Sequence, residues 1–138
     1  MRIVLDTNVV ISALLSDGTP YRLIQAAVDG TLMLCTSPAL LGELSKVLAR
    51  EHLASRLERQ SSSVEEALTL YAGLTVSVAP KAIPAVVPAD PDDDQVAAAA
   101  VAAKADLIVS GDRHLLDLGI HRTIRIVAPA QALAQIGG

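Results

Sequence analysis

Aromatic residues are almost missing from this chain of 138 residues, which has no Phe, no Trp and two tyrosines, Tyr21 and Tyr71. Proteins that bind single-stranded nucleic acid without sequence preference usually stack its bases on aromatic side chains. The composition therefore argues against a stacking surface of that kind.

Cysteine and uninterrupted apolar stretches are also scarce. The one cysteine, Cys35, cannot form a disulfide within the chain, which fits a reducing cytosol. Its apolar neighbours at 32–34 favour a buried thiol over a nucleophile. Asp6 and Asn8 interrupt the apolar residues at 1–15, and no small-residue cleavage site follows. We therefore expect a cytoplasmic protein without a signal peptide or a membrane span.

Positive charge is not in excess, since 11 Lys and Arg face 15 Asp and Glu, which gives a formal net charge of -4. A protein that holds nucleic acid by broad electrostatic attraction needs a basic face. The charge balance argues against that mode of binding. It remains compatible with a nuclease whose carboxylates are neutralised by metal ions.

Aliphatic residues dominate what is present, and hydrophobic residues make up 51% of the chain. This length supports one core, so we predict a single domain over 1–138. Short aliphatic runs predict strands at 2–5, 32–35, 75–78, 107–109 and 124–127. Spacing and capping patterns predict helices at 9–15, 21–28, from 38 onward, 51–60, 64–73, 94–104 and 129–136. This alternation predicts an α/β fold with a mostly parallel sheet covered on both faces.

Two aspartates stand directly after predicted strands. Asp6 follows the first strand and Asp112 follows the fourth, and in open parallel sheets functional groups gather at the carboxyl ends of the strands. If these strands are neighbours, the two carboxylates converge in one cleft. The alternative interpretation is that each aspartate only caps the helix that follows it.

Other carboxylates could face the same cleft. Glu43 lies on the edge of an apolar helix face, although it could simply pair with Lys46 on a solvated surface. The run 90–94 contains four aspartates before an alanine-rich helix and could be no more than an acidic turn. The stretch 80–91 holds four of the seven prolines and is predicted to be a loop. Carboxylates gathered in one pocket favour a hard cation, Mg²⁺ or Mn²⁺, which can activate water for phosphodiester hydrolysis.

Taken together, the motifs resemble those of the PIN-domain ribonucleases, in particular the toxins of bacterial and archaeal toxin-antitoxin pairs. The resemblance covers nearly the whole chain and rests on four stretches, which are 4–9 (VLDTNV), 37–43, 90–94 (DPDDD) and 109–112 (VSGD). It implies a three-layer PIN-like fold with a five-stranded sheet in the order 3-2-1-4-5 and helices on both faces. It also implies dependence on Mg²⁺ or Mn²⁺.

The resemblance assigns roles to individual residues. The acidic quartet of the family maps onto Asp6, Glu43, Asp94 and Asp112, which would be both the catalytic residues and the metal ligands. Residues expected to support the site or position substrate are Thr7, Asn8, Ser110, Asp92 and Asp93. Asp92 and Asp93 also compete with Asp94 for the place of the third acid. The implied partners are an RNA substrate, an antitoxin protein and a second copy of the chain in a homodimer.

Three other functions share parts of this pattern. A phosphatase of the haloacid dehalogenase type also places an aspartate after its first strand, but it needs a second one where Asn8 stands. A receiver domain of a signalling protein shares the layout and the acidic Mg²⁺ pocket, but its phosphoacceptor Asp and late Lys are not evident. A non-catalytic interaction domain would use the acids only as caps and solvated loops.

Overall fold

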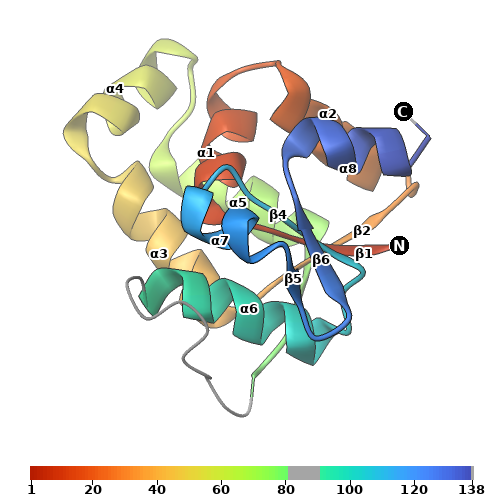
Figure 1. Ribbon diagram of the computed structural model, residues 1–138. Helices are drawn as coiled ribbons and strands as arrows, with labels where there is room; N and C mark the ends of the chain where they lie inside the picture. The colour runs from red at the N-terminus through yellow and green to blue at the C-terminus, as the bar shows by residue number, and fades with distance from the viewer. Residues whose placement is uncertain (81–90, 138) are drawn as a thin grey trace.

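A mixed sheet runs through the centre of the protein, whose computed structural model describes residues 1–80 and 91–137, with the backbone alone for 91–93. Six strands are found in this described part (Figure 1). They are β1 (Arg2–Leu5), β2 (Met33–Thr36), β3 (Thr75–Ser77), β4 (Leu107–Val109), β5 (Ile120–His121) and β6 (Ile124–Val127). Their order across the sheet is β3-β2-β1-β4-β6-β5.

The parallel part of the sheet has the order that the family resemblance implied. β3, β2, β1, β4 and β6 all pair in parallel, so β6 is the fifth strand of the expected 3-2-1-4-5 arrangement. The added strand β5 pairs antiparallel with β6 at one edge. Two residues are too few to show any periodicity, which is why the sequence did not predict this strand.

The described residues also contain eight helices, which connect the strands and follow the last one. They are α1 (Thr7–Leu15), α2 (Thr19–Val28), α3 (Pro38–Leu48), α4 (Glu51–Arg59), α5 (Val64–Leu74), α6 (Pro91–Ala103), α7 (Arg113–Leu118) and α8 (Pro129–Gln135). Local sequence explains where several begin. Ser37 and Ser63 accept hydrogen bonds from backbone N–H groups in the first turns of α3 and α5, as helix-capping serines do.

One helix boundary differs from the prediction. We expected the alanine-rich helix to begin at about Asp94, but α6 begins at Pro91. Proline is well suited to the first helical position because the N–H that it lacks would have no partner there. Asp94 therefore lies inside the first turns of the helix and does not open it. The predicted loop at 80–91 lies mostly outside the described residues.

Side chains alternate across the strands and supply two hydrophobic cores, one on each face of the sheet. Ile3 and Leu5 of β1 face a core shared with α1, α2, α3 and α8, whereas Val4 faces a core built with α6 and α7. Figure 1 shows α8 and α2 on one side of the strands and α6 on the other. Complete burial of one such aliphatic side chain contributes roughly 1.5–3 kcal/mol. Helices on both faces confirm the predicted layering.

Small side chains let α6 lie closely on the sheet. Its residues 96–100 are all buried, and four of them are alanine. This close packing against β1, β2 and β4 determines where the acidic first turn of the helix lies. In the described residues, no helix is long and apolar enough to cross a membrane.

Candidate active site

Asp6 is anchored at the end of β1 by bonds from both its backbone and its side chain. Its N–H donates to the carbonyl of Val109 at 2.9 Å, so the pairing of β1 with β4 continues to this residue. The Oδ1 atom accepts from the N–H of Thr7 at 2.8 Å and caps α1, as the sequence allowed. The residue is only 7% exposed. These contacts hold it in one orientation.

Ser110 connects Asp6 with the residue after the neighbouring strand. Its hydroxyl donates to Oδ2 of Asp6 at 2.8 Å and accepts from the N–H of Asp112 at 2.9 Å. Its own N–H donates to the carbonyl of Val127, which ties the same point to β6. Ser110 is fully buried. One hydroxyl thus fixes a carboxylate from β1 and the backbone that carries a second carboxylate after β4.

Asp112 caps α7 with one oxygen. Its Oδ1 accepts from the N–H of His114 at 2.7 Å, and the residue is half-buried. Within the described residues Oδ2 has no hydrogen-bond partner. The capping role that the sequence offered as an alternative is therefore real, but it engages only one oxygen and leaves the other available to a ligand.

Thr7 connects Asp6 with Glu43 on α3. Its hydroxyl donates to Oε2 of Glu43 at 3.3 Å, while its N–H is the group that donates to Asp6. Thr7 is buried and Glu43 half-buried. The sequence grouped Thr7 with the supporting residues by resemblance, but gave no reason for its role. Only the packing of α1 against α3 brings the two side chains together.

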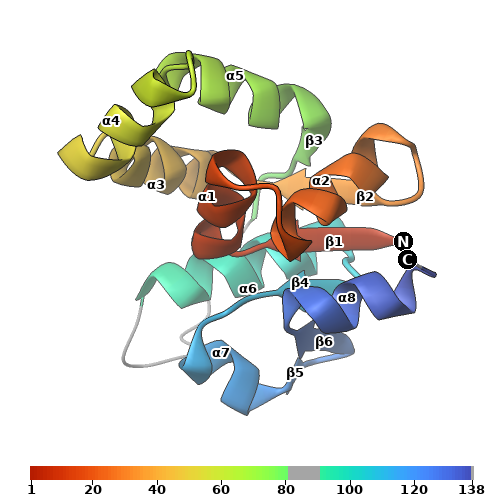
Figure 2. The same ribbon diagram turned by 90° about the horizontal axis from the view of Figure 1, so that it is seen from above.

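These bonds form one continuous chain of groups, Glu43–Thr7–Asp6–Ser110–Asp112, which we call the carboxylate network. It lies where β1 and β4 end, and Figure 2 shows α1 and α7 leaving the sheet on the same side. The first turn of α6 also lies on this side. Asp6 and Asp112 therefore follow two neighbouring strands, and Ser110 joins the side chain of Asp6 to the backbone of Asp112.

The remaining predicted site residues lie on α1 and α6. Asp94 is half-buried on α6, which packs against β1 and α3. Asn8 is exposed in the first turn of α1. Asp92 and Asp93 belong to the first turn of α6, but their side chains lie outside the described residues, as does Asp90. The structure therefore does not separate Asp92, Asp93 and Asp94 as candidates for the third acid.

The donor atoms of this site suit a hard cation, because every ionisable group in it is a carboxylate. Their spacing is more open than that of an assembled metal centre. In the described portion of the chain, no three His, Cys, Asp or Glu side chains lie close enough together to hold an ion. An ion bound by more than two of these carboxylates would have to draw them together.

The histidines lie elsewhere. His52 and His114 are exposed. His121 is half-buried, with its Nε2 enclosed and without a hydrogen-bond partner in the described residues. It lies in β5, which the sequence did not predict.

Comparison with known proteins gives one family match. A family model described as the PIN domain matches residues 2–114, a stretch that contains the whole carboxylate network and Asp94. No curated protein and no solved structure matches the chain.

Proposed function

Because the chain belongs to the PIN-domain family, a family of nucleases, we propose that it is a metal-dependent endoribonuclease that hydrolyses phosphodiester bonds of RNA. We further propose that residues 1–138 act as one nuclease domain. The observation that carries the proposal is the carboxylate network, which joins Asp6, Glu43 and Asp112 through Thr7 and Ser110. In this network the buried hydroxyl of Ser110 donates to the carboxylate of Asp6 and accepts from the backbone N–H of Asp112.

We propose that Asp6, Glu43, Asp94 and Asp112 hold Mg²⁺ or Mn²⁺, with Asp92 and Asp93 next to them on α6. Support comes from the all-oxygen donor set and from the Oδ2 atom of Asp112, which has no partner in the described residues. A bound divalent ion supplies Lewis-acid activation of water and stabilises negative charge on the phosphate. The attacking water loses a proton and forms a new P–O bond while the bond to the leaving ribose oxygen breaks, and that oxygen takes up a proton to become a hydroxyl.

The protein's own residues keep this site organised before substrate arrives. Ser110 holds Asp6 by donating to Oδ2, and Thr7 holds it by donating to Oδ1. Donated hydrogen bonds favour the ionised form of a carboxylate, which is the form that binds a cation. Because the donors to Asp6 are a backbone group and a buried hydroxyl, the Asp6 carboxylate is already oriented before an ion binds, and the other carboxylates would move towards it.

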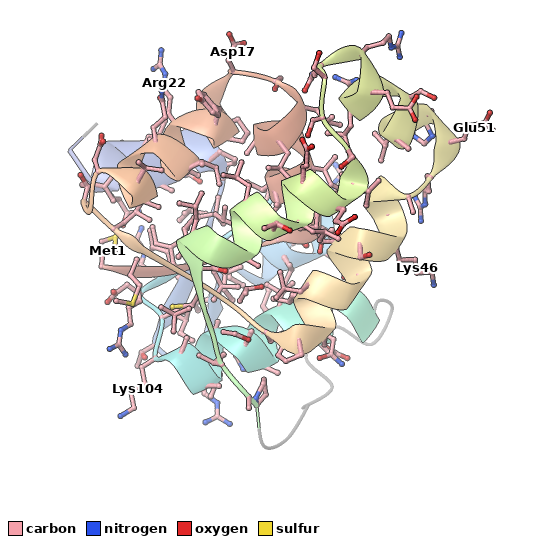
Figure 3. The ribbon with its side chains drawn as sticks, turned by 180° about the vertical axis from the view of Figure 1, so that it is seen from behind. Met1, Asp17, Arg22, Lys46, Glu51 and Lys104 are labelled. Carbon is pink, nitrogen blue, oxygen red and sulfur yellow. The ribbon has the colours of Figure 1, made fainter. Side chains whose placement is uncertain are left out.

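Positive charge that could meet RNA lies next to the acids. Lys46 and Arg50 follow Glu43 along one stripe of α3 and its end, and both are exposed. Figure 3 shows the Lys46 side chain extending away from the fold. We propose that these two residues steer phosphate groups towards a site that would otherwise repel them.

The biological role follows from the family resemblance alone. We propose that the protein is the toxin of a toxin-antitoxin pair, acts in the cytoplasm, forms a homodimer and is inhibited by an antitoxin that covers the acidic site. The match to a nuclease family favours a nuclease over a phosphatase or a receiver domain.

The first test is cleavage of mixed single-stranded and structured RNAs in Mg²⁺, in Mn²⁺ and in EDTA. Asp6→Asn and Asp112→Asn each replace one proposed ligand. As a matched control, Asp117→Asn replaces an exposed aspartate on α7, the helix that Asp112 caps. We expect cleavage that needs a divalent ion, is abolished in the first two variants and is unchanged in the third. Full activity of Asp6→Asn would remove the carboxylate network from the mechanism.

A further inference from the structure

A hollow of about 440 Å³ lies at the opposite end of the strands from the carboxylate network. Its walls are the end of α6, the residues that lead into β4 and the turn between β5 and β6. The carboxylates follow their strands, whereas Lys104–Asp106 and the turn residues Arg122 and Thr123 precede theirs. Figure 3 shows Lys104 and Lys46 on opposite sides of the molecule. The hollow is therefore separate from the candidate active site.

Positive charge dominates the rim of this hollow. Lys104 and Arg122 line it and are exposed, and neither side chain makes a hydrogen bond or ion pair with other described residues. Arg2 adds a third positive charge nearby, because its Nη1 donates to the carbonyl of Ala103. The one acid in the wall, Asp106, directs Oδ2 to the N–H of Arg2 at 2.8 Å. In a chain of net charge -4, this is a local excess of positive charge.

Both cations occupy backbone positions that favour glycine. Lys104 has a φ of 52° and follows α6, where the N–H groups of Lys104 and Ala105 donate to the carbonyls of Val101 and Ala100. This pattern of helix ending usually places glycine at the position of Lys104. Arg122, with a φ of 58°, begins a two-residue hairpin turn of a kind that also favours glycine or asparagine.

Ser61 is a third residue with a positive φ and provides a comparison. In the described chain, the non-glycine residues with positive φ are Ser61, Lys104 and Arg122. Ser61 has a φ of 58° after α4 and the same pattern of bonds as Lys104, since Ser61 and Ser62 donate to the carbonyls of Glu58 and Leu57. Two of the three strained positions therefore carry cations on one hollow, and strained residues tend to cluster at functional sites.

We propose that this hollow binds a phosphate group, supplied either by the backbone of an RNA chain or by a small phosphorylated ligand. Arg122 can engage two phosphate oxygens with its planar guanidinium, and Lys104 supplies a point charge. The hydroxyl of Thr123 offers a further donor, and Val101 provides an apolar wall for a sugar. The volume lies in the range of small-molecule sites.

Two glycine variants test the proposal with readouts of opposite sign. Lys104→Gly and Arg122→Gly remove the charges and relieve the left-handed backbone, so each should raise Tm by a few degrees while it weakens phosphate binding. The first probe is inorganic phosphate. Its binding is followed through the NMR shifts of the backbone amides at positions 104 and 122, in protein that keeps Asp6. The second is a labelled single-stranded RNA of about 12 nucleotides, bound to the Asp6→Asn variant in Mg²⁺.

For RNA we expect each glycine variant to weaken binding by about two- to fivefold and to lower the slope of log K against log salt by about 0.7. Ser61→Gly should raise Tm in the same way and leave both kinds of binding unchanged. If Lys104→Gly and Arg122→Gly weaken binding of both probes, the site is assigned to RNA phosphates. If they weaken binding of inorganic phosphate alone, the site is assigned to a small ligand. The phosphate measurement does not depend on nuclease activity.

Three outcomes would overturn the proposal. The first is unchanged binding of both probes in Lys104→Gly and Arg122→Gly. A second is an equal loss in Ser61→Gly, which would make the effect one of backbone strain. The third is binding of polyglutamate at this hollow without binding of phosphate or RNA, which would indicate an acidic protein partner.

Discussion

The hydroxyl of Thr7 donates to the carboxylate of Glu43 across 36 residues of sequence, at 3.3 Å. The same residue donates its backbone N–H to Asp6, so Thr7 joins two proposed metal ligands that come from β1 and α3. Burial of Thr7 keeps water from replacing these bonds. Its hydroxyl is therefore expected to matter for the geometry of the site more than for the stability of the fold.

Replacing Thr7 by Val should separate those two effects. Val keeps the branched shape but cannot donate, so Glu43 loses the hydrogen bond from Thr7. We expect kcat for RNA cleavage to fall roughly ten- to a hundredfold with little change in KM. The free energy of unfolding should fall by only about 1 kcal/mol. Thr7→Ser restores the hydroxyl and should restore most of kcat, whereas equal losses in both variants would exclude a role for the hydroxyl.

Ser110→Ala should destabilise the protein even without metal. The substitution removes the donor to Asp6 and leaves the N–H of Asp112 without its acceptor. A polar group left unpaired costs about 1–3 kcal/mol. That loss corresponds to a decrease in Tm of about 3–10 °C, measured by thermal denaturation in EDTA. Ser16→Ala, at an exposed serine, is the control and should change Tm by much less.

Divalent ions should stabilise the fold through the carboxylate network. A ligand present at about 100 times its Kd stabilises the native state by about 2.7 kcal/mol, so Mg²⁺ or Mn²⁺ should raise Tm measurably. The increase should vanish in Asp6→Asn and Asp112→Asn and persist in Asp117→Asn. If neither Mg²⁺ nor Mn²⁺ changes the Tm of the unaltered protein, the non-catalytic interaction domain would be favoured over the nuclease.

Tyr71 should make the protein sensitive to alkali. Its side chain is 2% exposed and its hydroxyl has no hydrogen-bond partner in the described residues. Burial raises the pKa of Tyr71 above its ordinary value of 10.0, and the nearby Cys35 adds to the increase. The folded state therefore keeps a proton that the unfolded state loses. This contribution to stability is complete below pH 10.0 and is lost as the pH rises further.

Tyr71→Phe tests both features of that hydroxyl. Removing an unpaired buried hydroxyl should raise the free energy of unfolding by about 1 kcal/mol at neutral pH, as measured by urea denaturation. Above pH 10.0 the variant should lose stability less steeply than the unaltered protein. Parallel pH profiles would show that Tyr71 ionises equally in both states. Burial likewise raises the pKa of Cys35, so some alkaline loss should remain.

Much of the fold was predictable because its determinants are local. Aliphatic runs identified the five parallel strands, and Ser37 with Pro38 marked the start of α3. The sequence missed β5, which exists only because β6 offers it an edge. It placed the start of α6 at Asp94, since the proline-rich stretch before it gave no clear boundary. The strand order was implied by family resemblance, because pairing partners distant in sequence have no local signature.

The candidate site divides in the same way. The sequence by itself determined that Asp6 and Asp112 follow two strands and that Glu43 lies on a helix edge. Only the tertiary structure decided that Ser110 holds Asp6 and the backbone of Asp112 at once, and that Thr7 reaches Glu43. The physical reason is range: capping and periodicity act over a few residues, whereas a hydrogen bond between side chains 104 residues apart exists only after β1 and β4 have paired.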